Sequence, residues 1–363
     1  MRTVLFVEPS FSLGGVRTLV KKMGSALKME NLRVISWRST DLIAPSIVLN
    51  YHLNDALRHV KRKNFYDVII YFGSIVGLGC IIDKLRNVPV VVFISGHPIY
   101  ELNKAMHNTT IPIRTRMGSV VNLSFNKLAY LANIADIWVC HTLTVCEEIG
   151  ITRHGNYVLL KQFILPSEIA YYNNLVKSGK FIKSKDDERV QVFSYLSYAD
   201  LPGLTLEMLV RIFNRVKKAA TKPVRFIIED PRRKGIAQVN DSIYVVGRMP
   251  WDTFLNTLAT SDLYVETAID EELRFTSLDA ALLRVPIAKI TASVFFDRQD
   301  YTEDEIIVAP SIQEFINVMT EYINSVDQLK PYYSRNIYNF VVNKRTWNAV
   351  KDHFMTALLS LIK

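Results

Sequence analysis

The sequence has few cysteines and no long uninterrupted apolar stretch. Its 3 cysteines, Cys80, Cys140 and Cys146, are too few for a disulfide framework and lack the Cys-x-x-Cys spacing of a zinc knuckle. We expect all three to be packing or surface residues in a reducing compartment. The longest charge-free apolar run, residues 68–82, is shorter than the roughly 20 residues that a membrane-spanning helix needs. The sequence therefore favours a cytoplasmic protein without a spanning helix.

A secretory signal and several catalytic motifs are also missing. The apolar run at residues 3–7 is too short for a signal sequence and is followed at once by Glu8 and Pro9, so we expect a buried strand there. No Gly-x-Ser-x-Gly elbow, P-loop or His-Glu-x-x-His motif occurs, which argues against hydrolases, NTPases and zinc peptidases of those types. The run at residues 73–79 lacks the glycine order of a dinucleotide fingerprint.

Short apolar runs rich in β-branched residues alternate with helix-patterned stretches along the whole chain, which is typical of βαβ units. We expect strands at residues 3–7, 32–36, 68–72, 88–94, 137–140, 190–195, 224–229, 242–246, 263–266, 287–290 and 305–308. We expect helices at residues 16–28, 204–219, 251–260, 277–283, 312–324 and 346–362.

The chain of 363 residues is longer than one hydrophobic core usually organises. The predicted fold is α/β, with two Rossmann-like doubly wound domains facing a cleft; the family resemblance given below implies in addition a C-terminal helix that crosses back to the N-terminal domain. The nearly all-polar stretch at residues 177–189 is typical of a linker. The expected parts are an N-terminal domain at 1–170, a linker at 171–189, a C-terminal domain at 190–340 and a crossing helix at 341–363.

The net charge of +9 is unevenly distributed. Residues 1–164 hold 19 Lys and Arg against 10 Asp and Glu, whereas residues 165–363 hold 25 of each. Such asymmetry usually marks the part that faces an anionic partner. Because the basic residues are spread over several elements without a nucleic-acid motif, we expect an anionic membrane surface or an anionic acceptor rather than nucleic acid. The predicted location is the cytoplasm, with peripheral association at the inner membrane face.

The most specific stretch of the sequence is residues 261–288. An apolar strand ends at Glu266, a polar loop follows, and a helix begins close to Thr276. A helix N-terminus after such a loop offers backbone N–H groups and the positive end of the helix dipole to a diphosphate. Two acids, Glu271 and Asp279, flank this helix start and are separated by seven residues.

This stretch resembles the nucleotide-sugar site of retaining GT-B glycosyltransferases, particularly glycosyltransferase family 4, whose pattern is an acid, seven residues and a second acid. The resemblance implies that Glu271 is catalytic and lies against the donor sugar, and that Asp279 binds the ribose. It implies a donor phosphate site around Phe275 and Thr276. With enough donors around the phosphates, no metal ion is needed.

Stretches of the N-terminal half fit the same resemblance. Gly14 and Gly15 follow the first strand, which implies an acceptor contact at Gly14 and a donor phosphate contact at Gly15; a plain tight turn is the alternative. His97 follows the strand at 88–94 and is a second catalytic candidate, with a structural hydrogen bond as the alternative. Arg114 and Arg116 are candidates for binding the acceptor.

The chain departs from the family at the donor phosphates. The family usually has glycines in place of Glu272 and Arg274, and it carries an Arg and a Lys after the first strand of the C-terminal domain, which this chain lacks. Arg248 and Arg274 are the candidate substitutes, because guanidinium groups pair well with phosphate. The basic turn at residues 232–234 offers further cations, or is a solvated turn.

The predicted function is therefore transfer of a sugar, as by a hexosyltransferase, from a nucleotide-sugar donor to an acceptor. The reaction is expected to be retaining and metal-independent, with no cofactor besides the donor substrate. A lipid-linked or otherwise anionic acceptor fits the basic N-terminal half. The alternative is a catalytically inactive GT-B-like module with a binding or structural role, which the missing phosphate clamp favours.

Overall fold

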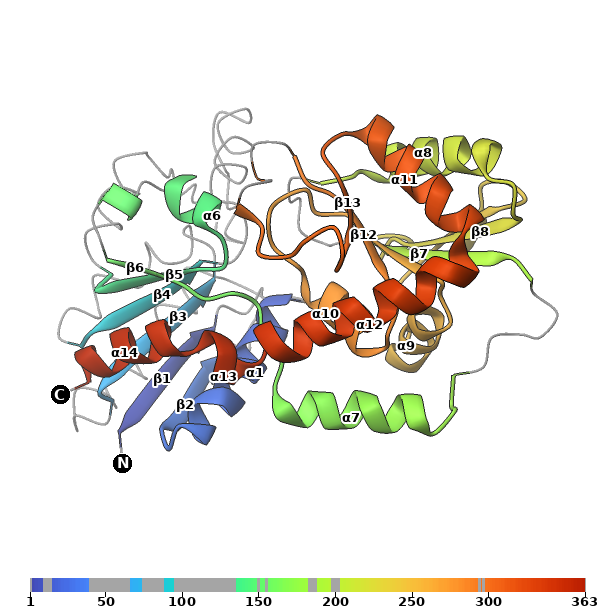
Figure 1. Ribbon diagram of the computed structural model, residues 1–363. Helices are drawn as coiled ribbons and strands as arrows, with labels where there is room; N and C mark the ends of the chain where they lie inside the picture. The colour runs from blue at the N-terminus through green and yellow to red at the C-terminus, as the bar shows by residue number, and fades with distance from the viewer. Residues whose placement is uncertain are drawn as a thin grey trace, which may run out of the picture. The chain divides into compact units, whose positions relative to one another are not determined.

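The computed structural model describes residues 2–8, 15–38, 66–73, 88–94, 135–148, 151–153, 156–181, 188–196, 203–292, 295 and 298–362. Figure 1 shows the chain as two compact units. The first unit combines Met1–Lys161 with Val350–Lys363, and the second is Gln162–Ala349. Each unit contains its own β-sheet. Because the first unit includes both ends of the chain, the chain passes between the units twice.

The first unit contains a six-stranded sheet in the order β2-β1-β3-β4-β5-β6, with all neighbours parallel. Its strands are β1 (Thr3–Glu8), β2 (Arg33–Arg38), β3 (Val68–Gly73), β4 (Val90–Ile94), β5 (Ile137–Cys140) and β6 (Tyr157–Leu159). The central strands β4 and β5 are buried at every residue. Because helices cover both faces of a parallel sheet, such strands have continuous apolar sequences instead of alternating ones.

The C-terminal helix α14 (Asp352–Leu361) belongs to the first unit, as the family resemblance implies. It packs on β5 and β6, and the Phe354 ring lies 5.6 Å from that of Phe93 on β4. The described helices of this unit are α1 (Gly15–Met29), α6 (Leu143–Glu148), the 3-10 helix η2 (Ile151–Arg153) and α14 (Asp352–Leu361). Within the described ranges, no helix has both the length and the apolar character needed to cross a membrane.

Cys140 and Cys146 form a disulfide bond, so our expectation that they are plain packing residues is wrong. Cys140 ends β5 and Cys146 lies on α6, and the turn between them brings their Cα atoms to 5.9 Å, within bonding range. Both residues are fully buried. Cys80 lies outside the described residues. The count of cysteines alone gave no sign of this short-range pair.

The second unit contains a seven-stranded sheet in the order β13-β12-β11-β7-β8-β10-β9. All neighbours are parallel except β9, which pairs antiparallel with β10 at the edge. The strands are β7 (Val190–Tyr195), β8 (Val224–Glu229), β9 (Ile236–Gln238), β10 (Ile243–Val246), β11 (Leu263–Glu266), β12 (Ile287–Ile290) and β13 (Ile307–Ala309). The six parallel strands have the order of a doubly wound Rossmann sheet.

Helices cover both faces of this second sheet (Figure 1). They are α7 (Pro166–Lys177), α8 (Leu206–Ala219), α9 (Trp251–Ala259), α10 (Phe275–Leu282), α11 (Ile312–Asn324), α12 (Val326–Lys344) and α13 (Trp347–Val350). Successive residues of β7 show the two faces: Val192 packs in the core under α8 and α11, whereas Phe193 packs in the core under α9, α10 and α12. The alternation of side chains along a strand thus gives the unit two hydrophobic cores.

Three α-helices of the described chain, α6, α7 and α12, and two short strands were not predicted from the sequence. Helix α7 has a recognisable start, with Pro166 at its first position and the Glu168 carboxylate accepting from the Leu165 N–H at 2.8 Å. Helix α12 carries Pro331 and has little apolar periodicity, because few of its side chains are buried. The strands β6 and β9 span three residues each, too few to show a period.

Candidate functional site

The second sheet reverses its direction of growth between β7 and β11. From β7 the chain adds β8 and β10 on one side, and it then returns to add β11, β12 and β13 on the other. In open parallel sheets, ligands bind outside the carboxyl ends of the strands at such a switch point. The loop that follows β11, residues 267–274, lies at this edge and contains Glu271.

Gly203 holds the segment after β7 against this loop. It forms an isolated antiparallel bridge with Ala268, and the Leu204 N–H donates to the Thr267 carbonyl oxygen at 2.8 Å. A Cβ atom at position 203 would lie 2.6 Å from the same carbonyl oxygen. Glycine is therefore required here for close approach of two backbones.

Glu266, the last residue of β11, fixes the loop to helix α10. Its Oε1 atom accepts from the N–H groups of Thr267 and Ala268 at 2.8 and 3.1 Å, and its Oε2 atom accepts from the Ser277 hydroxyl at 2.6 Å. Glu266 and Ser277 are both buried. Because a buried carboxylate is costly unless donors surround it, these hydrogen bonds strongly favour one arrangement of strand, loop and helix.

Three consecutive acids, Asp270, Glu271 and Glu272, occupy the middle of the loop and are at most 1% exposed. Asp270 lies between two cations: Arg274 donates to its Oδ2 atom, and the Lys289 Nζ atom lies 3.6 Å from its Oδ1 atom. The predicted catalytic residue Glu271 thus belongs to a buried cluster of opposite charges. Such charges are retained in an interior only when they are paired.

The pKa of Arg274 is raised in this cluster, whereas the pKa of Lys289 is lowered. Burial lowers the pKa of Arg274, but the carboxylates of Asp270 and neighbouring acids outweigh it and raise that pKa above its usual value. Burial lowers the pKa of Lys289 below its usual value, although Asp270 opposes the shift. The Nε atom of Arg274 is buried and has no hydrogen-bond partner among the described residues. A guanidinium N–H group is a strong hydrogen-bond donor to anions.

Helix α10 begins beside this donor. It runs from Phe275 with Arg274 as its N-cap, and no side chain caps its N-terminus. Its first N–H groups, with the positive end of the helix dipole, therefore lie at the edge where β11 ends. Phe275 and Thr276 are half-buried, whereas Ser277 points inward to Glu266. Three of the residues predicted to bind the donor, Arg274, Phe275 and Thr276, lie at this helix start, whereas Gly15 and Arg248 do not.

Asp279 lies one turn further along α10 and is held by helix α7. The Tyr172 hydroxyl donates to its Oδ1 atom at 2.7 Å. Burial, with the Asp279 carboxylate next, raises the pKa of Tyr172 above its usual value, so the hydroxyl keeps its proton. Tyr172 thereby orients a carboxylate that the sequence assigns to ribose.

Arg248 lies at a different point of the same sheet edge, after β10. The neighbouring Met249 N–H donates to the Oε1 atom of Glu229 at 3.0 Å, and Glu229 ends β8 beside Tyr195 of β7. Burial raises the pKa of Glu229 above its usual value. The hydrogen bond from the Met249 N–H and the charge of Arg248 oppose this shift without cancelling it. The Glu229 Oε2 atom is buried without a hydrogen-bond partner in the described part of the chain. Arg248 itself is exposed.

The remaining predicted residues belong to the first unit. Gly15 is the first residue of α1, after β1, as expected for a strand-loop-helix start. Gly14, His97, Arg114 and Arg116 lie outside the described residues. Their assignments remain predictions.

Sequence reasoning missed four residues that hold parts of this sheet edge from a distance. Lys289 and Arg345 bind the loop at Asp270 and Glu272, Tyr172 binds Asp279 on α10, and Glu229 accepts from Met249 after β10. Lys289 stands in a strand that is otherwise apolar, and a charged residue there is a signal of a buried ion pair. The other three occupy ordinary positions in their segments and carry no local signal. Across the described residues, no group of three or more His, Cys, Asp or Glu side chains is placed to hold a metal ion.

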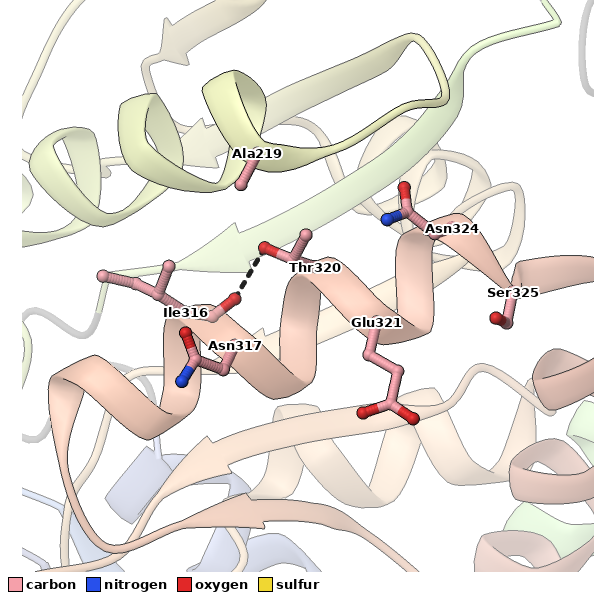
Figure 2. A pocket seen from close by; sticks show the side chains of 7 residues that line it. All are labelled: Ala219, Ile316, Asn317, Thr320, Glu321, Asn324 and Ser325. Atoms are coloured by element: carbon pink, nitrogen blue, oxygen red, sulfur yellow. Dashed lines mark hydrogen bonds between the residues drawn. The ribbon is translucent and has the colours of Figure 1, made fainter.

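A surface pocket of about 450 Å³ lies between α8 and α11 (Figure 2). Its lining comes from Ala219 and from one side of α11, where the Thr320 hydroxyl donates to the Ile316 carbonyl oxygen at 2.7 Å. None of the predicted site residues lines it. The pocket is therefore separate from the acidic loop.

The two doubly wound units and the returning C-terminal helix define the GT-B fold class, in agreement with the sequence prediction. Solved structures share this fold over the whole chain. HepE of Anabaena, in complex with UDP and glucose, matches with a TM-score of 0.63 and 12% identity, covering 99% of this chain and 100% of that one. Sucrose-phosphate synthase of Thermosynechococcus elongatus matches with a TM-score of 0.66 and 11% identity, covering 99% and 98%.

A plant enzyme domain has the same fold. The catalytic domain of starch synthase IV from Arabidopsis thaliana, bound to ADP and acarbose, matches with a TM-score of 0.66 and 10% identity, covering 99% of each chain. No protein-family profile and no curated protein matches the sequence. At these identities the likeness establishes the fold.

Proposed function

We propose that this protein is a glycosyltransferase that moves a sugar from a nucleotide-sugar donor to an acceptor, with retention of configuration and without a metal ion. The proposal rests on one observation: Glu271, the uncapped N-terminus of α10 and the unsatisfied Arg274 Nε–H group occur together at the switch point of the second sheet. The GT-B neighbours that hold UDP with glucose, or ADP, support it.

In the proposed mechanism the donor diphosphate lies at the start of α10. The N–H groups near Phe275 and Thr276 and the Arg274 guanidinium stabilise the charge that develops on the leaving group, because they are oriented before the reaction begins. Arg274 already pairs with Asp270, and its five N–H donors allow it to serve the carboxylate and a phosphate together. This sharing supplies a cation where the sequence lacks the usual phosphate clamp.

The other assignments follow the sequence. Glu271 lies against the donor sugar and Asp279, oriented by Tyr172, against the ribose. Arg248 and Gly15 contact the nucleotide part of the donor. The first unit supplies His97 as the second catalytic residue, and Gly14, Arg114 and Arg116 for an anionic or lipid-linked acceptor.

A panel of UDP-, GDP- and ADP-sugars distinguishes this enzyme from a GT-B-like module without activity. A donor that binds the folded state stabilises it by about 2.7 kcal/mol at a hundredfold excess over its Kd. We expect one nucleotide class to raise the thermal midpoint and to release nucleotide when acceptors are added. A panel without any shift would favour the inactive module.

Glu271→Gln tests the proposed chemistry with the donor identified in that panel. Removing a group that acts in the transition state typically costs about 10²–10⁴-fold in rate. We expect kcat to fall by at least about 100-fold, with the thermal shift by donor retained. Glu321→Gln, an exposed acid on α11, is the matched control and should leave kcat unchanged. Equal turnover in both variants would remove Glu271 from the mechanism.

A further inference from the structure

Arg345 is a fully buried cation at the C-terminal end of α12, far in sequence from the acidic loop. Its Nη1 atom donates to the Glu272 Oε1 atom at 2.6 Å, and its Nη2 atom donates to the Asp300 Oδ1 atom at 2.5 Å. Glu272 is also fully buried, whereas Asp300 is about one-third exposed. The guanidinium further lies 5.5 Å from the centre of the Phe340 ring.

The backbone of Arg345 is held as firmly as its side chain. Its carbonyl oxygen accepts from the Ile164 N–H at 2.8 Å, and the Ile164 carbonyl oxygen accepts from the Trp347 N–H at 2.9 Å, forming a parallel bridge between Ile164 and Thr346. The chain enters the second unit at Gln162 and leaves it at Ala349. Arg345 therefore stands where the two passages of the chain are hydrogen-bonded to each other.

Glu272, the partner of Arg345, is held at three points. Its carboxylate binds Arg345, its N–H donates to the Asp270 Oδ1 atom at 3.3 Å, and its carbonyl oxygen accepts from the Lys289 ammonium group. Since Glu272 directly follows Glu271 in the chain, fixing Glu272 fixes the backbone from which the Glu271 side chain extends.

We propose that Arg345 is a positioning residue for transfer: through Glu272 it sets the place of the Glu271 carboxylate. This inference rests on the proposed function of Glu271. A buried ion pair adds little net stability compared with a well-packed apolar pair, and its established use is to select one arrangement among several. A displacement of about 1 Å at a reacting group costs about 100-fold in rate, so an anchor at the next residue has a large effect on turnover.

The test separates folding from positioning with a double substitution. Arg345→Met alone leaves Glu272 buried without its cation, so we expect a lower thermal midpoint and lower kcat. Glu272→Met combined with Arg345→Met removes both charges, so we expect the midpoint to recover. In that double variant kcat should stay about 100-fold below wild type, and the KM for donor should change less than kcat. Amide exchange of residues 267–274 should be faster than in the wild-type protein.

Arg345→Lys supplies a second variant if the double variant does not fold. Its single ammonium group keeps the charge but cannot bridge two carboxylates as a planar guanidinium does, so we expect kcat between wild type and Arg345→Met. Arg211→Met, which breaks an exposed pair with Glu207, is the control and should change nothing.

Two outcomes would overturn the inference, and they differ. A double variant, or an Arg345→Lys variant, with wild-type kcat and wild-type amide exchange would show that the pair only supports folding, while the proposed function stands. Wild-type protein that transfers no sugar from any donor would overturn the proposed function, and the inference with it.

Discussion

Glu229 shows how burial at a single residue makes stability depend on pH. Glu229 is 3% exposed, and burial raises the pKa of its carboxyl group, with the Met249 N–H and Arg248 acting in the opposite direction. A group whose pKa is higher in the folded than in the unfolded state contributes stability in full below the unfolded value, about 4.3 for Glu. That contribution is lost as the pH rises through the folded value.

Glu229→Gln should therefore change the pH profile of unfolding. Wild type should lose stability relative to the variant as the pH rises from about 4 through the raised pKa of Glu229, because only the wild-type carboxyl group must lose a proton in a buried place. Urea unfolding of both proteins across this pH range measures the difference. Parallel profiles would show that Glu229 titrates at its ordinary pKa in the folded protein.

Glu272 and Arg274 illustrate what residue-level reading of the sequence misses. By sequence alone they are charged residues in a loop where the resembling family usually has glycines, and Arg274 is a candidate phosphate ligand. The structure gives each one a buried partner, Arg345 for Glu272 and Asp270 for Arg274. Asp270 lies four residues before Arg274, so this pair is visible in the sequence as an i, i+4 pair. Arg345 lies 73 residues after Glu272, so that pair is not visible.

At the scale of elements, the site depends on how closely the segment after β7 approaches the loop after β11. Gly203 is the contact point, because a Cβ atom there would lie 2.6 Å from a carbonyl oxygen. The two segments are neighbours because β7 and β11 are adjacent strands, although some sixty residues separate them in sequence. A single glycine thus joins two loops at the switch point of the sheet.

Gly203→Ala should destabilise the second unit by about 1–3 kcal/mol, as overpacking against rigid backbone does. It should also weaken donor binding, since the loop of Glu271 must shift. Thermal unfolding with and without donor measures both effects.

The control is Gly24→Ala in the middle of α1, where the added Cβ meets Phe6 at an ordinary 3.6 Å. Alanine favours a helix over glycine by about 0.5–1 kcal/mol, so this variant should be stabilised. If Gly203→Ala were equally harmless, the two loops would not need their close contact.

Most β-strands could be predicted because they are buried on both faces and have continuous apolar sequences, as β4, β5 and β11 do. The missed helix α12 has the opposite character: it is held by tertiary contacts at a few residues, among them Ile337 and Phe340, and its own sequence gives no strong period. Sequence patterns report burial, so elements with little burial escape them.

At the scale of the whole molecule, the excess of positive charge lies in residues 1–164, which hold 19 Lys and Arg against 10 Asp and Glu, whereas residues 165–363 hold 25 of each. Helix α1 exposes Arg17, Lys21 and Lys28 beside a buried apolar stripe that includes Leu19 and Met23. Basic residues near an anionic surface contribute about 1 kcal/mol each. We infer from this pattern an attraction of the first unit to anionic lipid.

Vesicle flotation tests that attraction. Wild type should float with vesicles that contain anionic lipid and not with neutral ones, and added salt should release it. Replacing the three exposed basic residues of α1 by Gln should reduce the bound fraction. The same change at Arg211, Arg215 and Lys218 of α8, in the second unit, where basic and acidic residues balance, should not. Binding that ignores lipid charge would end the proposal.

The sequence by itself determined the parallel α/β class, because strand burial and helix starts leave their pattern in neighbouring residues. Its resemblance to GT-B glycosyltransferases implied the two-unit fold and the roles of Glu271 and Asp279, and those roles stay predictions. Only the tertiary structure decided what holds these acids: Tyr172 binds Asp279 across 107 positions, and Arg345 binds Glu272, the neighbour of Glu271, across 73. Partners so far apart in the sequence leave no local pattern, because their contact depends on how whole helices and strands pack. The same holds for the buried Glu229 carboxyl group, whose surroundings come from three separate strands and the loops after them.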